Sequence, residues 1–267
     1  MRKKSVLLIA GSDSSAGAGI QADLKTLSAF KVYAATVLTA LTAQNTKGVS
    51  KVLNIPNNFI EAQIKSVSED LNITFIKIGM LSNINIIKTV NKCLEKYLPS
   101  VPIVLDPVMI AKGGHPLLEE DAIDYLKETI LIKSFIITPN ILEAEKILNY
   151  KIDNISSMKK CFQNFEGLGV KRVILKGGHM LKSRRNITDL LFNQGKISEF
   201  KNKRINTINT HGTGCSLASA LTANLFMGKS LEKSVENSIN YVHSGIRNSF
   251  LIGHGHNPIN HFTDFIS

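Results

Sequence analysis

The sequence predicts an α/β fold: a three-layer α/β/α arrangement in which helices cover both faces of a mainly parallel central sheet. Short apolar runs alternate with longer segments of helical periodicity along the 267 residues, a pattern typical of parallel strands joined by helices. Polar and glycine residues follow each apolar run directly. Neither a Pro/Ser-rich linker nor an internal repeat divides the chain, so we expect a single domain over residues 1–267.

Six runs have the nearly continuous apolar composition of strands that are buried on both faces. They are residues 5–10, 36–41, 75–78, 103–105, 135–137 and 173–175. A further apolar run at residues 190–192 precedes the turn residues Asn193, Gln194 and Gly195 and then Ile197. This order predicts a hairpin over residues 190–208.

Three segments repeat apolar residues at the spacing of one helical face. These sets are Ile20, Leu24 and Leu27; Ile60, Ile64, Val67 and Leu71; and Leu217, Leu221 and Leu225. Each predicts an amphipathic helix whose apolar side packs against the sheet.

The composition excludes several classes of protein. With 43% hydrophobic and 20% charged residues, the chain is neither disordered nor a fibrous protein. No apolar run approaches the roughly 18 residues that span a bilayer, and the three cysteines form no close pair, so disulfide scaffolds are not expected. We expect a cytoplasmic protein without a membrane partner.

The formal charge of +11 is concentrated in residues 171–204, which hold ten basic and two acidic residues. A solvated lysine-rich face is the simplest interpretation, and a field that attracts a polyphosphate is the alternative. Nucleic acid is not an expected partner, because no aromatic stacking motif or recognition helix accompanies the charge.

Polar and glycine residues collect where the predicted strands end. They are residues 11–13, 44–45, 79–80, 106–107, 138–140 and 176–179. Ligands of open parallel sheets bind beyond the carboxyl ends of the strands. The carboxyl groups, the lysine and the glycines in this set favour a phosphorylated ligand.

Two glycine-rich loops compete as phosphate sites. Residues 17–22 match G-x-G-x-x-A, the dinucleotide pattern, but no acidic residue lies between Asp23 and Glu61 to hold a ribose. A nicotinamide oxidoreductase is therefore a remote alternative. Residues 212–215 open a predicted helix, where free N–H groups and the helix dipole attract anions.

Asn140 and Glu143 lie on one face at the start of a predicted helix. The carboxylate could hold a water on Mg²⁺, or the pair could form a capping box. Lys176 follows a buried strand and could neutralise a phosphate. His254, His256 and His261 are interpreted as part of a structural turn rather than a metal site.

Residues 209–215 (NTHGTGC) resemble the D-T-x-G-A-G-D signature of the ribokinase superfamily, with Cys215 in place of the final aspartate. Asn140 and Glu143 resemble its N-x-x-E magnesium motif. These two motifs are joined by further matches along the chain. Taken together, the matches make the chain similar, over residues 5–262, to the hydroxymethylpyrimidine/phosphomethylpyrimidine kinases of thiamine biosynthesis. Those matches are residues 10–13 (AGSD), 17–25 (GAGIQADLK), 39–41 (TAL), 43–46 (AQNT), 77–81 (KIGML) and 176–179 (KGGH).

The resemblance implies a ribokinase-like fold. It also implies ATP-dependent phosphorylation of 4-amino-5-hydroxymethyl-2-methylpyrimidine and then of its monophosphate, with Mg²⁺ as cofactor. Pyridoxal kinase is the nearest alternative, and a nucleic-acid-binding protein is a remote one. We expect a homodimer.

Site residues are carried over by the same resemblance. Cys215, Gly212, Gly214 and Lys176 take catalytic roles; Gln44, Ala18, Asp23 and Met80 bind the pyrimidine; and Asp106, Asn140, Glu143, Lys176 and Thr213 bind the nucleotide, with Glu143 on Mg²⁺ through water. Cys215 falls on the position of the general base, and we expect the helix N-terminus to lower the pKa of its thiol. Ser14 and Ala16 depart from the proline and glycine usual in the family, which predicts a less rigid loop there.

Overall fold

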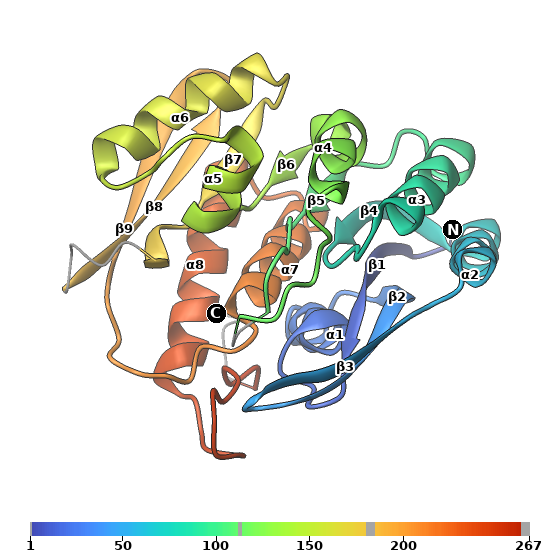
Figure 1. Cartoon of the computed structure of the whole chain (residues 1–267), viewed down its shortest axis with the longest axis horizontal. Coiled ribbons are helices and arrows are strands. Elements are labelled where there is room, and N and C mark those ends of the chain that lie inside the picture. Colours follow the sequence, from blue (N-terminus) through green and yellow to red (C-terminus); the bar gives the residue numbers. More distant parts are fainter. Residues whose placement is uncertain (1, 112–113, 180–184, 263–267) are drawn as a thin grey trace.

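The structure, a computed structural model, describes residues 2–111, 114–179 and 185–262. These residues form one nine-stranded sheet of order β3-β2-β1-β4-β5-β6-β7-β8-β9 (Figure 1). The run β2-β1-β4-β5-β6-β7 is parallel, while β3, β8 and β9 pair antiparallel at the two ends. The strands are β1 Lys4–Asp13, β2 Ala34–Asn45, β3 Gly48–Asn54, β4 Asn72–Ile78, β5 Ile103–Leu105, β6 Ile136–Ile137, β7 Arg172–Leu175, β8 Asn186–Asn193 and β9 Lys196–Lys203.

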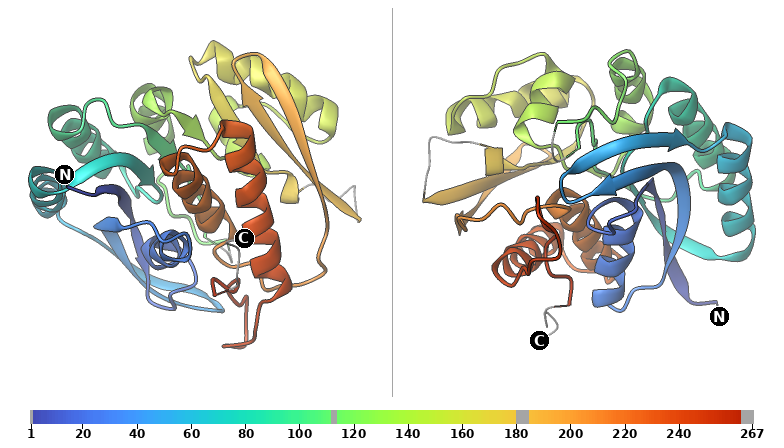
Figure 2. Two further views of the ribbon diagram at one scale, coloured as in Figure 1. Left: turned by 180° about the vertical axis from the view of Figure 1, so that it is seen from behind. Right: turned by 60° about the horizontal axis from the view of Figure 1, so that its bottom comes forward.

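Helices cover both faces of the sheet, which confirms the predicted three layers. Helices α2 to α6 pack on one face, and α1, α7 and α8 pack on the other (Figure 2). The helices are α1 Gly19–Ala29, α2 Asn57–Asp70, α3 Ile84–Tyr97, α4 Ala122–Leu126, α5 Ile141–Leu148, α6 Ile155–Gly167, α7 Thr213–Phe226 and α8 Leu231–Arg247. Among the described residues, no helix has the length and apolarity needed to cross a bilayer.

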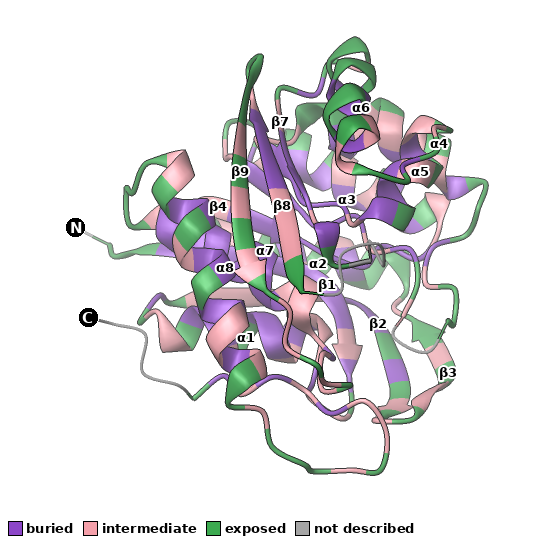
Figure 3. Ribbon diagram, turned by 90° about the vertical axis from the view of Figure 1, so that its left-hand side faces the viewer, coloured by how far each residue is buried: buried purple, intermediate pink, exposed green. Residues whose placement is uncertain are grey.

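The central strands are buried on both sides, as their composition predicts. Val6, Leu7, Leu8 and Ile9 of β1 are all 0% exposed, and Figure 3 shows buried strands between helices whose outer sides are exposed. Burying such β-branched and leucine side chains is the main favourable contribution to folding.

Strands β1, β2 and β4 are longer than predicted, and one strand, β3, was missed. β2 continues to Asn45, so Gln44 lies within a strand rather than after it. Its partner β3 was not predicted, because this edge strand is mostly exposed and carries no buried apolar run. The β2–β3 hairpin therefore holds Gln44 on a hydrogen-bonded ladder.

The predicted hairpin near residue 190 is confirmed as β8 and β9. Gln194 and Gly195 both have positive φ, at 48° and 87°, as the tight hairpin turn between right-twisted strands requires.

Two helices bury a different surface from the one predicted. In α1, Leu24 is 41% exposed, whereas Asp23 and Leu27 are fully buried. The inward face therefore includes a carboxylate, which the apolar pattern could not reveal. In α7, every residue from 216 to 225 is buried, because the helix lies between α1, α8 and the sheet. The expectation of an amphipathic α7 is wrong.

The two leucines of α1 provide a matched test of this face. Leu27→Ala should lower the free energy of unfolding by about 2–5 kcal/mol, since it opens a cavity in a packed core. Leu24→Ala should change it by less than about 1 kcal/mol. Urea unfolding of both variants measures the difference; equal losses would contradict the observed orientation of α1.

Candidate active site

A cavity of about 410 Å³ lies at the carboxyl ends of the parallel strands. All but one of the predicted site residues line it. They are Ala18, Gln44, Met80, Asp106, Asn140, Glu143, Lys176, Gly212, Thr213, Gly214 and Cys215. The parallel sheet brings these strand ends to one edge and places the start of α7 beside them, as predicted.

The loop that begins α7 requires glycine at position 212 and is crowded at position 214. Gly212 has φ +79°, and a Cβ there would lie 1.9 Å from the carbonyl oxygen of Gly17. A Cβ on Gly214 would lie 3.3 Å from Lys176 Nζ. The absence of side chains therefore lets the helix N-terminus approach both the first loop and the lysine. A helix N-terminus beside a lysine suits an anion.

Lys176 carries a positive charge into the cavity. Its Nζ donates a hydrogen bond to Asp106 Oδ1 at 3.0 Å, and that oxygen also accepts one from Thr138 Oγ1 at 3.1 Å. Burial opposes the charge on Lys176, but Asp106 and Glu143 outweigh it and raise the pKa of the ammonium group. The lysine is therefore a cation at neutral pH.

Asn140 and Glu143 form the capping box that starts α5. Asn140 Oδ1 accepts from Glu143 N at 3.0 Å, and Glu143 Oε2 accepts from Asn140 N at 2.8 Å. Burial raises the pKa of Glu143 to about 7; Lys176 opposes the shift and Asp106 adds to it. Because the same carboxyl group lines the cavity, capping and ligand binding are compatible here.

The carboxyl oxygens of Asp106 and Glu143 fit Mg²⁺ held mainly by water and phosphate oxygens. Within the described ranges, no group of three or more His, Cys, Asp or Glu side chains could hold a metal alone.

Asp23 is the exception among the predicted residues, and its expected contact with the pyrimidine is wrong. It is fully buried and does not line the cavity. Both its oxygens accept from Lys77 Nζ, at 2.8 and 2.7 Å, and Ser219 Oγ donates to Oδ1 at 2.7 Å. Lys77, which was not predicted, reaches the cavity wall. The sequence does contain a signal for this ion pair, because Lys77 lies within an otherwise apolar strand. A charge buried in such a strand needs a partner of opposite charge.

The hydrogen-bonded pair of Asp13 and His211 was also not predicted from the sequence. Asp13 Oδ2 accepts from the backbone N–H groups of Gly17 and Ala18 at 3.1 and 2.9 Å and lies 2.7 Å from His211 Nε2. Burial opposes ionisation of Asp13, but hydrogen bonds from His211 and Ser15 outweigh it and lower its pKa. An ionised Asp13 thus ties the loop after β1 to the loop before α7.

Ser14 and Ala16, the two departures from the family pattern in the loop after β1, have different consequences. Ala16 adopts φ +58°, a left-handed conformation in which glycine is less strained. Ser14 Oγ donates to the carbonyl oxygen of Gln44 and accepts from its backbone N–H, both at 2.8 Å. The loop is therefore tied to β2 rather than loosened, contrary to expectation.

Two of the three late histidines, His256 and His261, make structural contacts, whereas His254 is exposed. The backbone N–H of His256 donates to Thr46 O at 2.7 Å, its Nδ1 lies 3.1 Å from Ile208 O, and His261 Nε2 lies 3.0 Å from Ser216 Oγ. The turn packs against the tip of the β2–β3 hairpin, visible in red beside blue in Figure 2.

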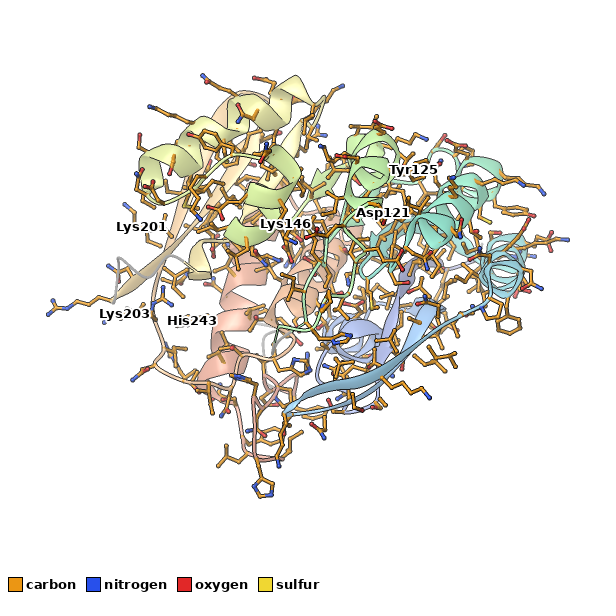
Figure 4. The ribbon with its side chains drawn as sticks, viewed as in Figure 1. Asp121, Tyr125, Lys146, Lys201, Lys203 and His243 are labelled. Atoms are coloured by element: carbon orange, nitrogen blue, oxygen red, sulfur yellow. The ribbon has the colours of Figure 1, made fainter. Side chains whose placement is uncertain are left out.

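The basic stretch lies mainly on the surface. Lys201 and Lys203 of β9 are exposed and lie on the outer side of the molecule near His243 (Figure 4). Of the described cations in this stretch, only Lys176 lines the cavity; Lys182 and Arg184 fall outside the described residues. The described cations therefore fit a solvated face.

Comparison with known proteins adds a decisive observation. The profile of the family described as phosphomethylpyrimidine kinase matches residues 13–260. The chain belongs to this family. It is 42% identical over 256 residues to the hydroxymethylpyrimidine/phosphomethylpyrimidine kinase of Bacillus subtilis, covering 96% of this chain and 94% of the relative.

Solved structures agree with the family assignment. A phosphomethylpyrimidine kinase from Clostridium difficile is 41% identical with a TM-score of 0.79, covering 90% of this chain and 98% of that one. The ADP complex of a Bacillus subtilis pyridoxal kinase is 30% identical with a TM-score of 0.89, covering 98% of both chains. The resemblance read from the motifs and the ribokinase-like fold are confirmed.

Cys215 differs from its expected ionisation state. The side chain lines the cavity, but burial raises the pKa of its thiol to about 12, with Asp23 and Asp106 adding to the shift and Lys77 opposing it. A partly ionised thiol at neutral pH is therefore the wrong expectation. In this family member the group carries its proton before substrates bind.

This state of Cys215 predicts the pH dependence of its alkylation. Only the thiolate reacts, so the rate of modification by iodoacetamide should rise about tenfold per pH unit from pH 7 to pH 10 without a plateau. Peptide mass spectrometry assigns the modified cysteine, and N-acetylcysteine serves as control. A plateau below pH 9 would show an acidic thiol and contradict the assigned pKa.

Proposed function

We propose that the chain is an ATP-dependent kinase that phosphorylates 4-amino-5-hydroxymethyl-2-methylpyrimidine, and then the monophosphate, in thiamine biosynthesis. The observation that carries the proposal is one cavity, in a member of this family, that joins Gln44 to Lys176 and the start of α7. The Gln44 amide, which can pair with a heteroaromatic ring, thus lines the same cavity as the anion site formed by Lys176 and the start of α7.

The ring end of the cavity is formed by Gln44, Ala18 and Met80. The Gln44 amide both donates and accepts, which suits a ring nitrogen beside an exocyclic amino group. A Cβ on Gly11 would lie 2.8 Å from Met80 Sδ, so a side chain there would displace the Met80 thioether that lines the site. Asp23 contributes indirectly, because it holds Lys77 at the wall.

The phosphoryl end provides positioning and charge, which are the main needs of this reaction. Lys176 and the N–H groups at the start of α7 would neutralise the transferred group, and Gly212 and Gly214 would let it approach the backbone. We assign the nucleotide to the side of Asp106, Asn140 and Thr213. Glu143 would hold Mg²⁺ through water, and the ion would supply neutralisation of the phosphate charge.

The hydroxymethyl group would lie against Cys215. Because the transition state of phosphoryl transfer is loose, its nucleophile gains little bond order early and need not be deprotonated in advance. As the new oxygen–phosphorus bond forms and the bond from the γ-phosphorus to ADP breaks, the hydroxyl proton would pass to an oxygen of the transferred phosphoryl group and from there to water, and ADP would depart. We therefore keep Cys215 as a contact to the reacting hydroxyl and do not assign it as a pre-formed base.

Pyridoxal phosphorylation is the second candidate activity, supported by the close structural similarity to a pyridoxal kinase. The ring edge of pyridoxal has no amino group beside its nitrogen, so it would leave part of Gln44 unpaired. Because the chain belongs to a kinase family, we do not carry forward the alternatives of a nicotinamide oxidoreductase and a nucleic-acid-binding protein.

We retain a cytoplasmic homodimer as part of the proposal.

The test is ATP turnover on the pyrimidine alcohol, its monophosphate, pyridoxal and ribose, followed by separation of the products. We expect both pyrimidines to be phosphorylated with the highest kcat/KM. Gln44→Ala should lower kcat/KM for the pyrimidines by roughly 10- to 100-fold, since ring polar groups lose their partner, while the KM for ATP is unchanged.

Gln163→Ala, on the exposed side of α6, is the matched control and should behave as the wild type. A higher kcat/KM on pyridoxal than on either pyrimidine would establish the second candidate instead. Unchanged kinetics in Gln44→Ala would remove that residue from the site.

A further inference from the structure

His211 lies between a carboxylate and the amide that we assign to the substrate ring. Its Nε2 is 2.7 Å from Asp13 Oδ2 and 3.3 Å from Gln44 Nε2. The ring has little freedom to move: the residue is 5% exposed, and a Cβ on Gly17 would lie 2.4 Å from its Cδ2. The backbone N–H of His211 also donates to Asn257 O at 3.2 Å.

The partner of His211 decides which of its atoms carries a proton. Asp13 is an acceptor, because its Oδ2 already accepts from the N–H groups of Gly17 and Ala18. A contact of 2.7 Å to this oxygen therefore requires a proton on His211 Nε2. That nitrogen then has no lone pair to offer to Gln44.

The amide of Gln44 consequently meets two conflicts when its nitrogen faces His211. Two N–H groups oppose each other across 3.3 Å. Thr42 Oγ1 has a single proton but faces two acceptors, Ser12 O at 2.9 Å and Gln44 Oε1 at 3.1 Å. Buried donors and acceptors without partners are costly.

Turning the amide by 180° about its last bond relieves both conflicts. The oxygen then shares His211 Nε2–H with Asp13 Oδ2, as the longer branch (3.3 Å) of a bifurcated hydrogen bond whose shorter branch is 2.7 Å. The nitrogen donates to Thr42 Oγ1, whose own proton remains on Ser12 O. We propose that His211 holds Gln44 in this turned orientation and thereby makes the site selective for a ring with an amino group beside an unprotonated nitrogen. The inference rests on the proposed function.

Selectivity follows from the fixed order of donor and acceptor on Gln44. A 4-amino ring presents a donor beside an acceptor, whereas the corresponding 4-oxo ring presents a carbonyl acceptor beside an N–H donor. A freely turning amide can pair with either ring. An amide whose orientation is held pairs with one and leaves two mismatched contacts with the other. His211 is thus a positioning residue that acts through Gln44.

The experiment compares kcat/KM for 5-hydroxymethyl-2-methylpyrimidines carrying a 4-amino or a 4-oxo group. The wild type should favour the amino ring on the order of 100-fold. In His211→Leu this preference should fall to about tenfold or less, mainly through KM. His211→Gln, whose side-chain N–H can replace Nε2–H, should recover most of the preference. His243→Leu on α8 should match the wild type, because His243 does not line the cavity and its ring lies at the carbonyl oxygen of Lys203.

Three results would overturn the inference. They are a wild type that uses both rings equally, a His211→Leu variant that keeps the full preference, and a His211→Gln variant no more selective than His211→Leu. A purely structural role for His211 would lower activity on both rings together and leave their ratio unchanged. If the wild type phosphorylated neither ring, the proposed function itself would fail, which is a distinguishable outcome.

A measurement on the wild type keeps the inference testable if the His211 variants do not fold. Nitrogen-15 NMR of the labelled histidines should show His211 protonated at Nε2 at pH 8. An unprotonated Nε2 would overturn the inference, because that nitrogen could then accept from Gln44.

Discussion

The hydrogen bond between Asp13 and His211 joins two residues 198 positions apart in the chain, at 2.7 Å. It connects the end of β1 to the loop that starts α7. Through the N–H groups of Gly17 and Ala18, the same carboxylate holds the loop that packs against Gly212. Together with the close approach of Gly212 to Gly17 and the hydrogen bonds between Ser14 and Gln44, this contact fixes the ring end of the cavity relative to its phosphoryl end.

Buried charge in the site is compensated pair by pair. Lys77 and Asp23 have fully buried side chains, and Lys176 with Asp106 are 16% and 2% exposed. Such pairs contribute little net stability, but removing one partner is costly because it leaves the other charge buried and unpaired. The two pairs have different roles. The pair of Lys77 and Asp23 fixes the wall behind the cavity, whereas the pair of Lys176 and Asp106 presents a cation to the cavity. The same low-polarity surroundings keep the Cys215 thiol protonated.

Much of this organisation could be predicted from the sequence, because parallel strands buried on both faces have apolar runs and their ends converge at one edge. That rule located Asp106 and Lys176, and the glycines at a predicted helix start located the loop at residues 212–215. Edge strand β3 could not be predicted, because too few of its side chains are buried to produce an apolar pattern in the sequence. The inward direction of Asp23 escaped because it depends on Lys77, 54 residues away. The ionisation of Cys215 was misjudged because helix dipoles are visible in a sequence, whereas desolvation is not.

A double-mutant cycle on Asp13→Asn and His211→Leu tests most directly whether this contact organises the site. The measured quantity is kcat/KM for the pyrimidine alcohol in the wild type, the two single variants and the double variant. The account predicts strong non-additivity, with the double variant no worse than the poorer single variant and a coupling energy above about 1.5 kcal/mol. Losses that add within about 0.5 kcal/mol would contradict it, since the two residues would then act independently.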